Sequence, residues 1–93
     1  MDLDVLRAQW EVGPGGEPAI ALVEFNSIAA GILAGDAMAK KAPVNLLDAR
    51  TICPGKFMVL IGGLTAPVQE SLEAGLAAGG DAVIDHLLLP NVH

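Results

Sequence analysis

The chain has 93 residues, which is enough for one small domain, and it is 53% hydrophobic but only 17% charged. Because so small a domain buries only a modest core, we expect exposed apolar surface that further copies of the chain cover in a homo-oligomer. The net charge of −6 and the aromatic content of 3% argue against binding to nucleic acid or to an anionic membrane surface.

The single cysteine excludes an intramolecular disulfide framework and suits a reducing compartment. The first residues are acidic and amphipathic, unlike a signal peptide, and the apolar runs are too short to span a bilayer. We therefore expect a cytoplasmic protein.

Residues 1–12 are predicted to form a short N-terminal helix. Leu3, Leu6 and Trp10 are spaced three and four residues apart, as on one face of a helix. The stretch "GPGGEP", residues 13–18, is then predicted to be a linker, because glycine and proline interrupt regular structure. The folded domain is expected to cover residues 19–93.

From residue 19 onward the pattern predicts alternating strands and helices. Strands are expected at 19–25, 44–51, 56–63 and 81–90, and helices at 26–42 and 64–80. Asn26 or Ser27 can cap the first helix, and Thr65 the second. The order βαββαβ indicates an α+β, ferredoxin-like fold, with two helices on one face of a four-stranded antiparallel sheet.

Each predicted helix has an apolar side that we expect to face the core. The side chains expected there are Ile28, Ile32 and Met38 in the first helix and Val68, Leu72 and Leu76 in the second.

The only cysteine, Cys53, lies between the second and third predicted strands. Pro54 and Gly55 fit the two central positions of a type II turn, so that Cys53 and Lys56 flank it. The residues leave two interpretations open. Cys53 is an incidental small residue of an exposed turn, or it is a ligand completed by symmetry, with thiolates from several subunits holding an iron–sulfur cluster.

Other motifs give little support to catalysis or nucleotide binding. No glycine-rich phosphate-binding pattern opens either helix, and no cysteine or histidine cluster has metal-binding spacing within one chain. His86, in an apolar strand, is expected to be a hydrogen-bonded structural residue. Glu24 is expected to pair across an interface or with a helix end. We expect no catalytic residues.

The stretch "AIALVEFNSIAAGILAGDAMAKKAPVNLL", followed by "TICPGKFMVLIGG", resembles the bacterial microcompartment (BMC) shell-protein domain. The resemblance extends over roughly residues 19 to 93. It implies flat hexagonal tiles, as hexamers or as trimers of tandem domains, that pack edge to edge with other shell proteins. It also implies a central pore lined by Ile52, Cys53, Pro54 and Gly55, with Lys56 just beyond. Tile-edge contacts are implied for Lys40, Asn91 and His93, with Asn91 in place of the usual arginine.

One branch of that family, the tandem-domain shell proteins of propanediol-utilising microcompartments, has an almost identical "TICPGKF" stretch. The similarity implies that Cys53 is the metal ligand of a 4Fe-4S cluster at the pore, held by three copies for electron transfer across the shell. Three alternatives stay open. They are a plain metabolite pore without a cluster, a small thiol or redox enzyme of ferredoxin-like fold, and a small-molecule-binding regulatory domain.

Two departures from the family pattern lead to hypotheses about the chain as a whole. The cluster-binding branch has two domains, so this chain is expected to form a hexamer by itself or to be half of a tandem protein, natural or engineered. Family members continue past the position of His93 into a short helix, which residues 2–10 resemble. A circular permutation and an ordinary N-terminal extension are both hypotheses for that segment.

Overall fold

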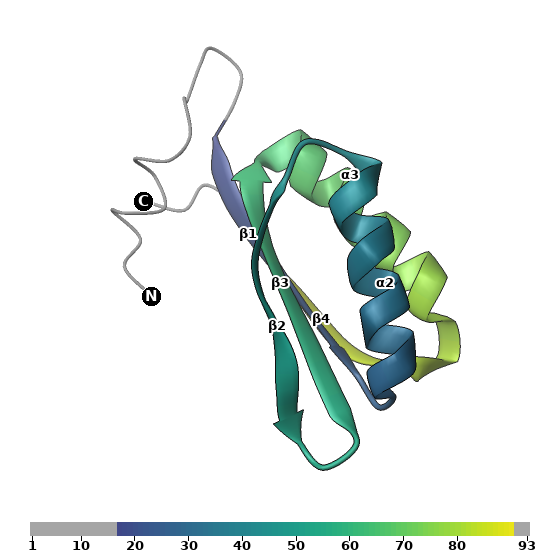
Figure 1. Cartoon of the computed structure of the whole chain (residues 1–93). Helices are drawn as coiled ribbons and strands as arrows, with labels where there is room; N and C mark the ends of the chain where they lie inside the picture. Colours follow the sequence, from purple (N-terminus) through teal and green to yellow (C-terminus); the bar gives the residue numbers. More distant parts are fainter. Residues whose placement is uncertain (1–16, 91–93) are drawn as a thin grey trace.

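A computed structural model describes residues 17–90 of the chain (Figure 1). Its elements are β1 (Pro18–Phe25), α2 (Ile28–Lys41), β2 (Asn45–Cys53), β3 (Lys56–Leu64), α3 (Thr65–Gly79), the 3-10 turn η1 (Gly80–Ala82) and β4 (Val83–Leu89). The predicted helix over residues 1–12 and most of the predicted linker lie outside the described residues, as do Asn91 and His93.

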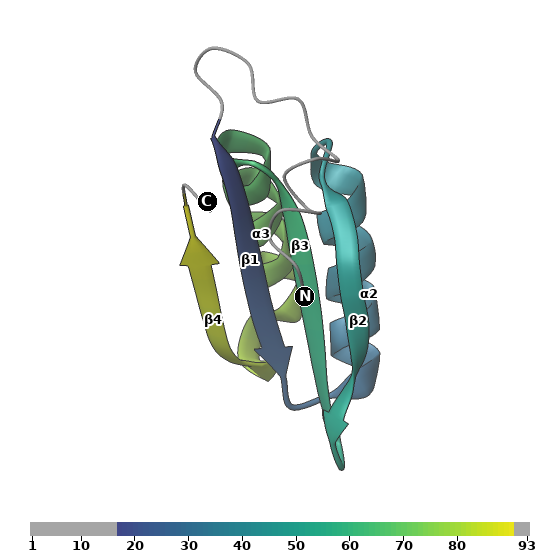
Figure 2. The same cartoon turned by 90° about the vertical axis from the view of Figure 1, so that its left-hand side faces the viewer.

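The four strands form one antiparallel sheet in the order β2-β3-β1-β4. Both helices cover the same face of this sheet, and the opposite face is turned toward the viewer in Figure 2. Each helix connects two strands that lie on either side of a third one, which is the split βαβ arrangement. The predicted α+β fold class is therefore confirmed.

The core lies between the sheet and the two helices. Alternate residues of β1 point toward the helices and are buried, as the period of two along a strand requires. The buried apolar cluster consists of Ala19, Ala21, Val23, Phe25, Ala34, Met38, Phe57, Val59, Ile61, Val68 and Leu72, with Leu76 packed partly buried against it. The predicted core face of α3 is thus confirmed.

The predicted core face of α2 is only partly right. Met38 is buried, but Ile28 and Ile32 are 40% and 57% exposed. The residues of α2 that are buried with Met38 are Gly31, Ala34 and Gly35. Because these residues are small, α2 lies close to the sheet, and its branched side chains are turned outward.

The helix ends also differ in one respect from the prediction. The Ser27 hydroxyl accepts a hydrogen bond from the Ala30 backbone N–H at 3.2 Å and caps α2 as expected. Thr65 does not cap α3; its hydroxyl donates to the Glu17 carbonyl at 2.8 Å, and the N-cap position is Leu64. The helices have 14 and 15 residues, and neither is long and apolar enough to cross a membrane.

Candidate functional site at the tip of the β2–β3 hairpin

The hairpin of β2 and β3 extends beyond the ends of both helices (Figures 1 and 2). Thr51 pairs with Phe57 and Cys53 pairs with Lys56, and the register shifts between Thr51 and Cys53. This irregularity leaves Ile52 without a paired residue, as in a β-bulge, and it increases the local twist. The pairing of β3 with β1 ends at Phe57, so the tip is held only by its own two strands.

The turn at the tip has the geometry that its sequence predicts. Gly55 has φ +79°, which is the value of the second central residue of a type II turn. A Cβ at Gly55 would meet no atom within 4 Å, so the glycine is required by backbone conformation and not by close packing. Pro54 supplies the fixed φ of the first central position. The prediction that Cys53 and Lys56 flank this turn is confirmed.

All five residues predicted to line a pore, residues 52–56, lie together at this tip, and all are exposed. Cys53 carries a free thiol, and Ile52 is 40% exposed. Within residues 17–90, no three histidine, cysteine or carboxylate side chains come together as a metal site would require. One chain supplies one exposed thiol, so a cluster fits this site only where several copies bring their tips together.

The residue predicted at the tile edge, Lys40, lies in the last turn of α2, far from the hairpin tip (Figure 1). Its ammonium group pairs with the Asp36 carboxylate at 2.9 Å, and the two side chains are 75% and 59% exposed. An ion pair this exposed contributes little to folding. The Lys40 side chain is therefore available for a contact outside its own chain.

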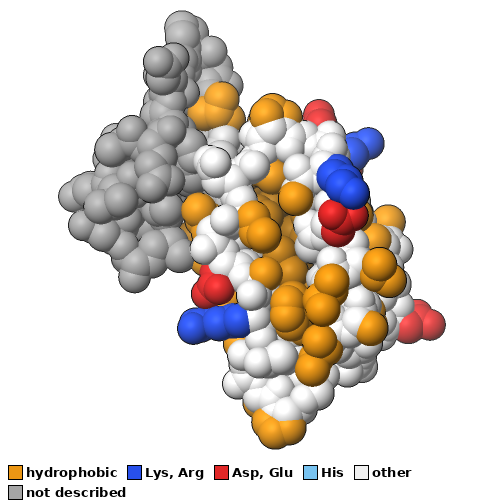
Figure 3. Space-filling model, viewed as in Figure 1, with side chains coloured by type: hydrophobic (Ala, Val, Ile, Leu, Met, Phe, Trp, Pro, Cys, Tyr) orange, Lys and Arg blue, Asp and Glu red, His pale blue; other side chains and the backbone are white. Residues whose placement is uncertain are grey.

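An apolar groove between α2 and β2 was not predicted. It is lined by Gly31, Ile32, Gly35, Asp36, Ala39, Leu46, Ala49 and Phe57, and Figure 3 shows the hydrophobic side chains along this side. Two of these residues, Ile32 and Leu46, are 57% and 50% exposed. Apolar side chains gathered in this way on a small domain indicate a surface that a partner covers. In the sequence, the groove was indicated only by α2 having more branched apolar residues than the core of the domain buries.

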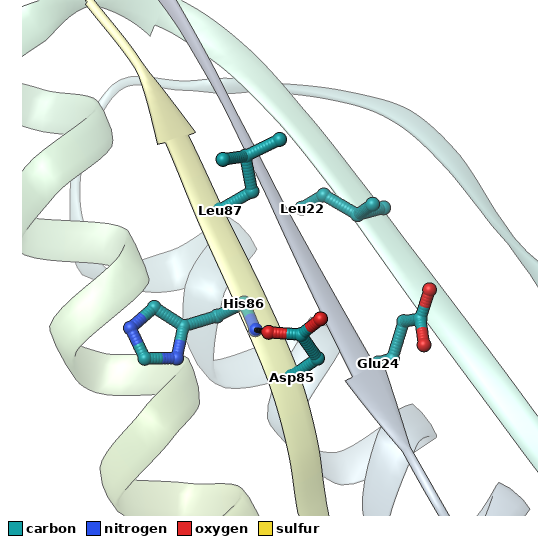
Figure 4. Close-up of a pocket in the computed structure, with 5 residues that line it drawn as sticks. All are labelled: Leu22, Glu24, Asp85, His86 and Leu87. Atoms are coloured by element: carbon teal, nitrogen blue, oxygen red, sulfur yellow. Dashed lines mark hydrogen bonds between the residues drawn. The ribbon is translucent and has the colours of Figure 1, made fainter.

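The opposite face of the sheet carries a second hollow, lined by Leu22, Glu24, Asp85, His86 and Leu87. Glu24 and Asp85 are cross-strand partners, and both project to the same side (Figure 4). The His86 ring points to the other side of β4, and the His86 backbone N–H donates to Asp85 Oδ1 at 2.8 Å. Glu24 thus lies on the face away from α2 and α3, so within residues 17–90 it does not pair with a helix end.

Comparison with known proteins places this architecture among shell proteins. The chain is 51% identical over 75 residues to the bacterial microcompartment shell protein PduT of Citrobacter freundii; the match covers 81% of this chain and 41% of PduT. It is 32% identical over 77 residues to the carboxysome shell protein CcmK3 of Halothece, with 78% and 76% covered.

A solved microcompartment protein from Desulfitobacterium hafniense superposes with a TM-score of 0.81 at 53% identity, covering 83% of this chain and 43% of that one. The chain thus spans about two-fifths of the length of PduT and of this structural relative. The model of the BMC domain family matches residues 19–92. The chain therefore belongs to the BMC domain family.

Proposed function

We propose that this chain is a structural shell protein of a bacterial microcompartment, whose copies assemble into a flat tile with the β2–β3 hairpin tips around a central pore. The observation that carries the proposal is the combination of an apolar groove along α2 and β2 with a hairpin tip that projects beyond the helices. Family membership and the names of PduT and CcmK3 support it.

The groove gives the assembly its driving force. Burial of exposed apolar area contributes about 25 cal/mol per Å², and Ile32 and Leu46 in the groove each expose half or more of their surface. A neighbouring subunit that covers these side chains turns them into part of a shared core. Ring closure requires the groove to meet a different surface of the next copy.

The hairpin tips supply the pore. Residues 52–56 are exposed and lie beyond the end of the β1–β3 pairing, so that copies of the tip can gather around one axis. A small metabolite passing there would meet Ile52, Cys53 and Lys56. The shell lies in the bacterial cytoplasm, and the tile packs edge to edge with other shell proteins through Lys40. The net charge of −6 per chain disfavours the approach of anions from a distance.

Light scattering at several protein concentrations tests the assembly. We expect a mass of six times the 9.5 kDa of one chain, and a stable monomer would contradict the shell function. Ile32→Glu places a charge in the groove and is expected to reduce the mass to that of a monomer that keeps its circular dichroism spectrum. Ala77→Glu, the same charge on the exposed side of α3, is the matched control and is expected to leave the assembly intact.

A second proposal concerns Cys53 as the protein ligand of a 4Fe-4S cluster at the pore. Its support is the exposed thiol directly before the Pro54–Gly55 turn, which presents one sulfur per chain at the tip. A cluster there would supply one-electron transfer across the shell. The chain's own contribution is to hold the thiol at the exposed hairpin tip, opposite Lys56.

Anaerobic reconstitution with iron and sulfide separates a cluster site from a plain metabolite pore. The unmodified chain is expected to bind iron and to absorb broadly in the visible range, and Cys53→Ser is expected to lose both. His86→Ala is the control, because it removes a metal-binding side chain from another part of the fold. Equal iron content in the unmodified chain and in Cys53→Ser would contradict the cluster and favour a plain metabolite pore. A monomer or dimer with a highly reactive thiol would instead indicate a thiol enzyme.

A further inference from the structure

The sheet face that points away from both helices is turned toward the viewer in Figure 2, and we call it the open sheet face. It is apolar along its centre. Its side chains form three cross-strand rows over β3, β1 and β4. The rows are Gly62–Ile20–Leu89, Leu60–Leu22–Leu87 and Met58–Glu24–Asp85. Two rows are therefore apolar, and the third ends in two carboxylates.

These rows enclose a continuous trough. The hollow shown in Figure 4 adjoins another, lined by Ile20, Leu22, Leu60, Leu87 and Leu89, and the two share Leu22 and Leu87. Leu87 and Leu89 are 51% and 44% exposed in the described part of the chain. On the β2 side the trough is bordered by the ion pair of Arg50 and Asp48, whose atoms Nε and Oδ2 are 3.2 Å apart.

We propose that residues 2–10 of the same chain cover the open sheet face as an amphipathic helix. Leu3, Leu6 and Trp10 form the apolar stripe that such a helix would place in the trough, and Asp4 and Glu11 fall on the opposite side. Residues 11–17 connect Trp10 to β1, which begins at Pro18. This connection is short, and the trough begins only two residues later, at Ile20. A tethered segment acts at an effective concentration in the millimolar range, which favours it over a separate partner.

The dimensions of the segment and of the trough agree. A helix over residues 2–10 is about 14 Å long at about 1.5 Å per residue. The rows from Ile20 to Glu24 extend over about 13 Å at about 3.3 Å per residue along β1. The stretch between Trp10 and Pro18 spans up to about 25 Å when extended, so it can turn the helix back over the sheet.

The charges of the two surfaces are complementary. Glu24 and Asp85 are like charges directly opposite each other, an arrangement that is destabilising unless a cation lies nearby. Arg7 is the only cationic side chain of residues 1–16 and lies beside the apolar stripe. Helical side chains lean toward the helix N-terminus, so a helix with Trp10 near Ile20 directs Arg7 toward the two carboxylates.

Fluorescence tests the proposal directly, because Trp10 is the only tryptophan. In the full chain we expect blue-shifted emission and protection from acrylamide quenching. Leu87→Gln places an amide in the trough and is expected to shift the emission to the red and to raise the quenching constant at least two-fold. Leu33→Gln, on the exposed side of α2, is the control and is expected to change neither. Equal solvent exposure of Trp10 in all three proteins would overturn the proposal.

Disulfide formation distinguishes the chain's own segment from a second copy. In a Cys53→Ser background, Leu6→Cys with Leu60→Cys is expected to cross-link within one chain under mild oxidation. On a denaturing gel this product migrates as a compact monomer. Leu6→Cys with Leu33→Cys is the control that should not cross-link. A cross-linked dimer, or no cross-link in either protein, would contradict the proposal.

Discussion

Gly31 of α2 lies directly against the ring of Phe57 in β3, so that a Cβ at Gly31 would come within 2.5 Å of the ring atom Cδ2. At Gly35, in the next turn of α2, a Cβ would lie 3.3 Å from Cγ2 of Val59. The backbone of α2 is thus in contact with the sheet. This close approach turns Ile28 and Ile32 outward, and Ile32 lines the groove where a neighbouring subunit is proposed to pack.

Gly31→Ala is expected to destabilise the domain. Alanine gains about 1 kcal/mol of helix propensity over glycine. However, the Phe57 ring is packed in the core and cannot move away from the new Cβ, and overpacking of this kind costs about 1–3 kcal/mol. Gly35→Ala is the matched comparison. Its milder contact offsets the propensity gain, so we expect a change below about 1 kcal/mol. Urea unfolding at one fixed protein concentration measures both, and a Gly31→Ala protein more stable than the unmodified chain would refute the packing argument.

Ser71→Ala is expected to stabilise the domain. Ser71 is fully buried in α3, and its hydroxyl has no hydrogen-bond partner within the described residues. A buried polar group without a partner costs about 1–3 kcal/mol, and alanine removes this cost and leaves only a small void. The expected gain is about 1 kcal/mol in the free energy of unfolding, measured by urea denaturation. A loss of stability would mean that the hydroxyl has a partner after all.

Ser27→Ala is the same substitution with the opposite expected sign. The Ser27 hydroxyl accepts the hydrogen bond from the Ala30 N–H that caps α2. Its removal is expected to lower stability by about 1 kcal/mol. Ser27→Asp should retain most of the stability, because a carboxylate accepts the same bond and favours a helix N-terminus. Equal losses in the alanine and aspartate variants would mean that the capping hydrogen bond is not the source of the stability that Ser27 provides.

Gly55→Ala is expected to cost about 1–2 kcal/mol, because an alanine at φ +79° is strained although no neighbouring atom opposes its Cβ. Gly55→Asn should cost less, since asparagine tolerates positive φ better. Gly55→Ala is also expected to reduce iron binding after reconstitution more than Gly55→Asn does, because the turn positions the thiol of Cys53. Thermal unfolding and iron analysis of the two variants check both effects, and identical results for alanine and asparagine would exclude the backbone explanation.

Lys40→Ala is expected to leave folding unchanged within about 0.5 kcal/mol, because the pair with Asp36 is exposed. It is also expected to prevent tiles from packing edge to edge without dissociating the tile. Electron microscopy for sheets, together with light scattering for the tile, separates the two levels. Lys41→Ala, at the neighbouring exposed position, is the control. Extended sheets in the Lys40→Ala protein would show that this lysine is not the tile-edge contact.

Local signals in the sequence were sufficient for the order of the elements and for the hairpin tip. The apolar run of β1, the Ser27 cap and the Pro54–Gly55 pair act within a few residues of each other, so no knowledge of the partner surface is needed. Failures occurred where a distant residue decides. Thr65 was expected to cap α3, but its hydroxyl bonds to Glu17, a residue 48 positions away in the chain.

The sequence by itself determined the α+β fold class, the position of the only thiol on a tight turn and the family of the domain. The tertiary structure decided which side of α2 is buried. Hydrophobic periodicity favoured Ile28 and Ile32, but the space above Phe57 and Val59 admits only the small residues of the helix. The tertiary structure also decided that the groove between α2 and β2 and the trough on the open sheet face lie on the surface. Burial depends on the shape of the opposing surface as well as on hydrophobicity, and that shape exists only once the strands are paired.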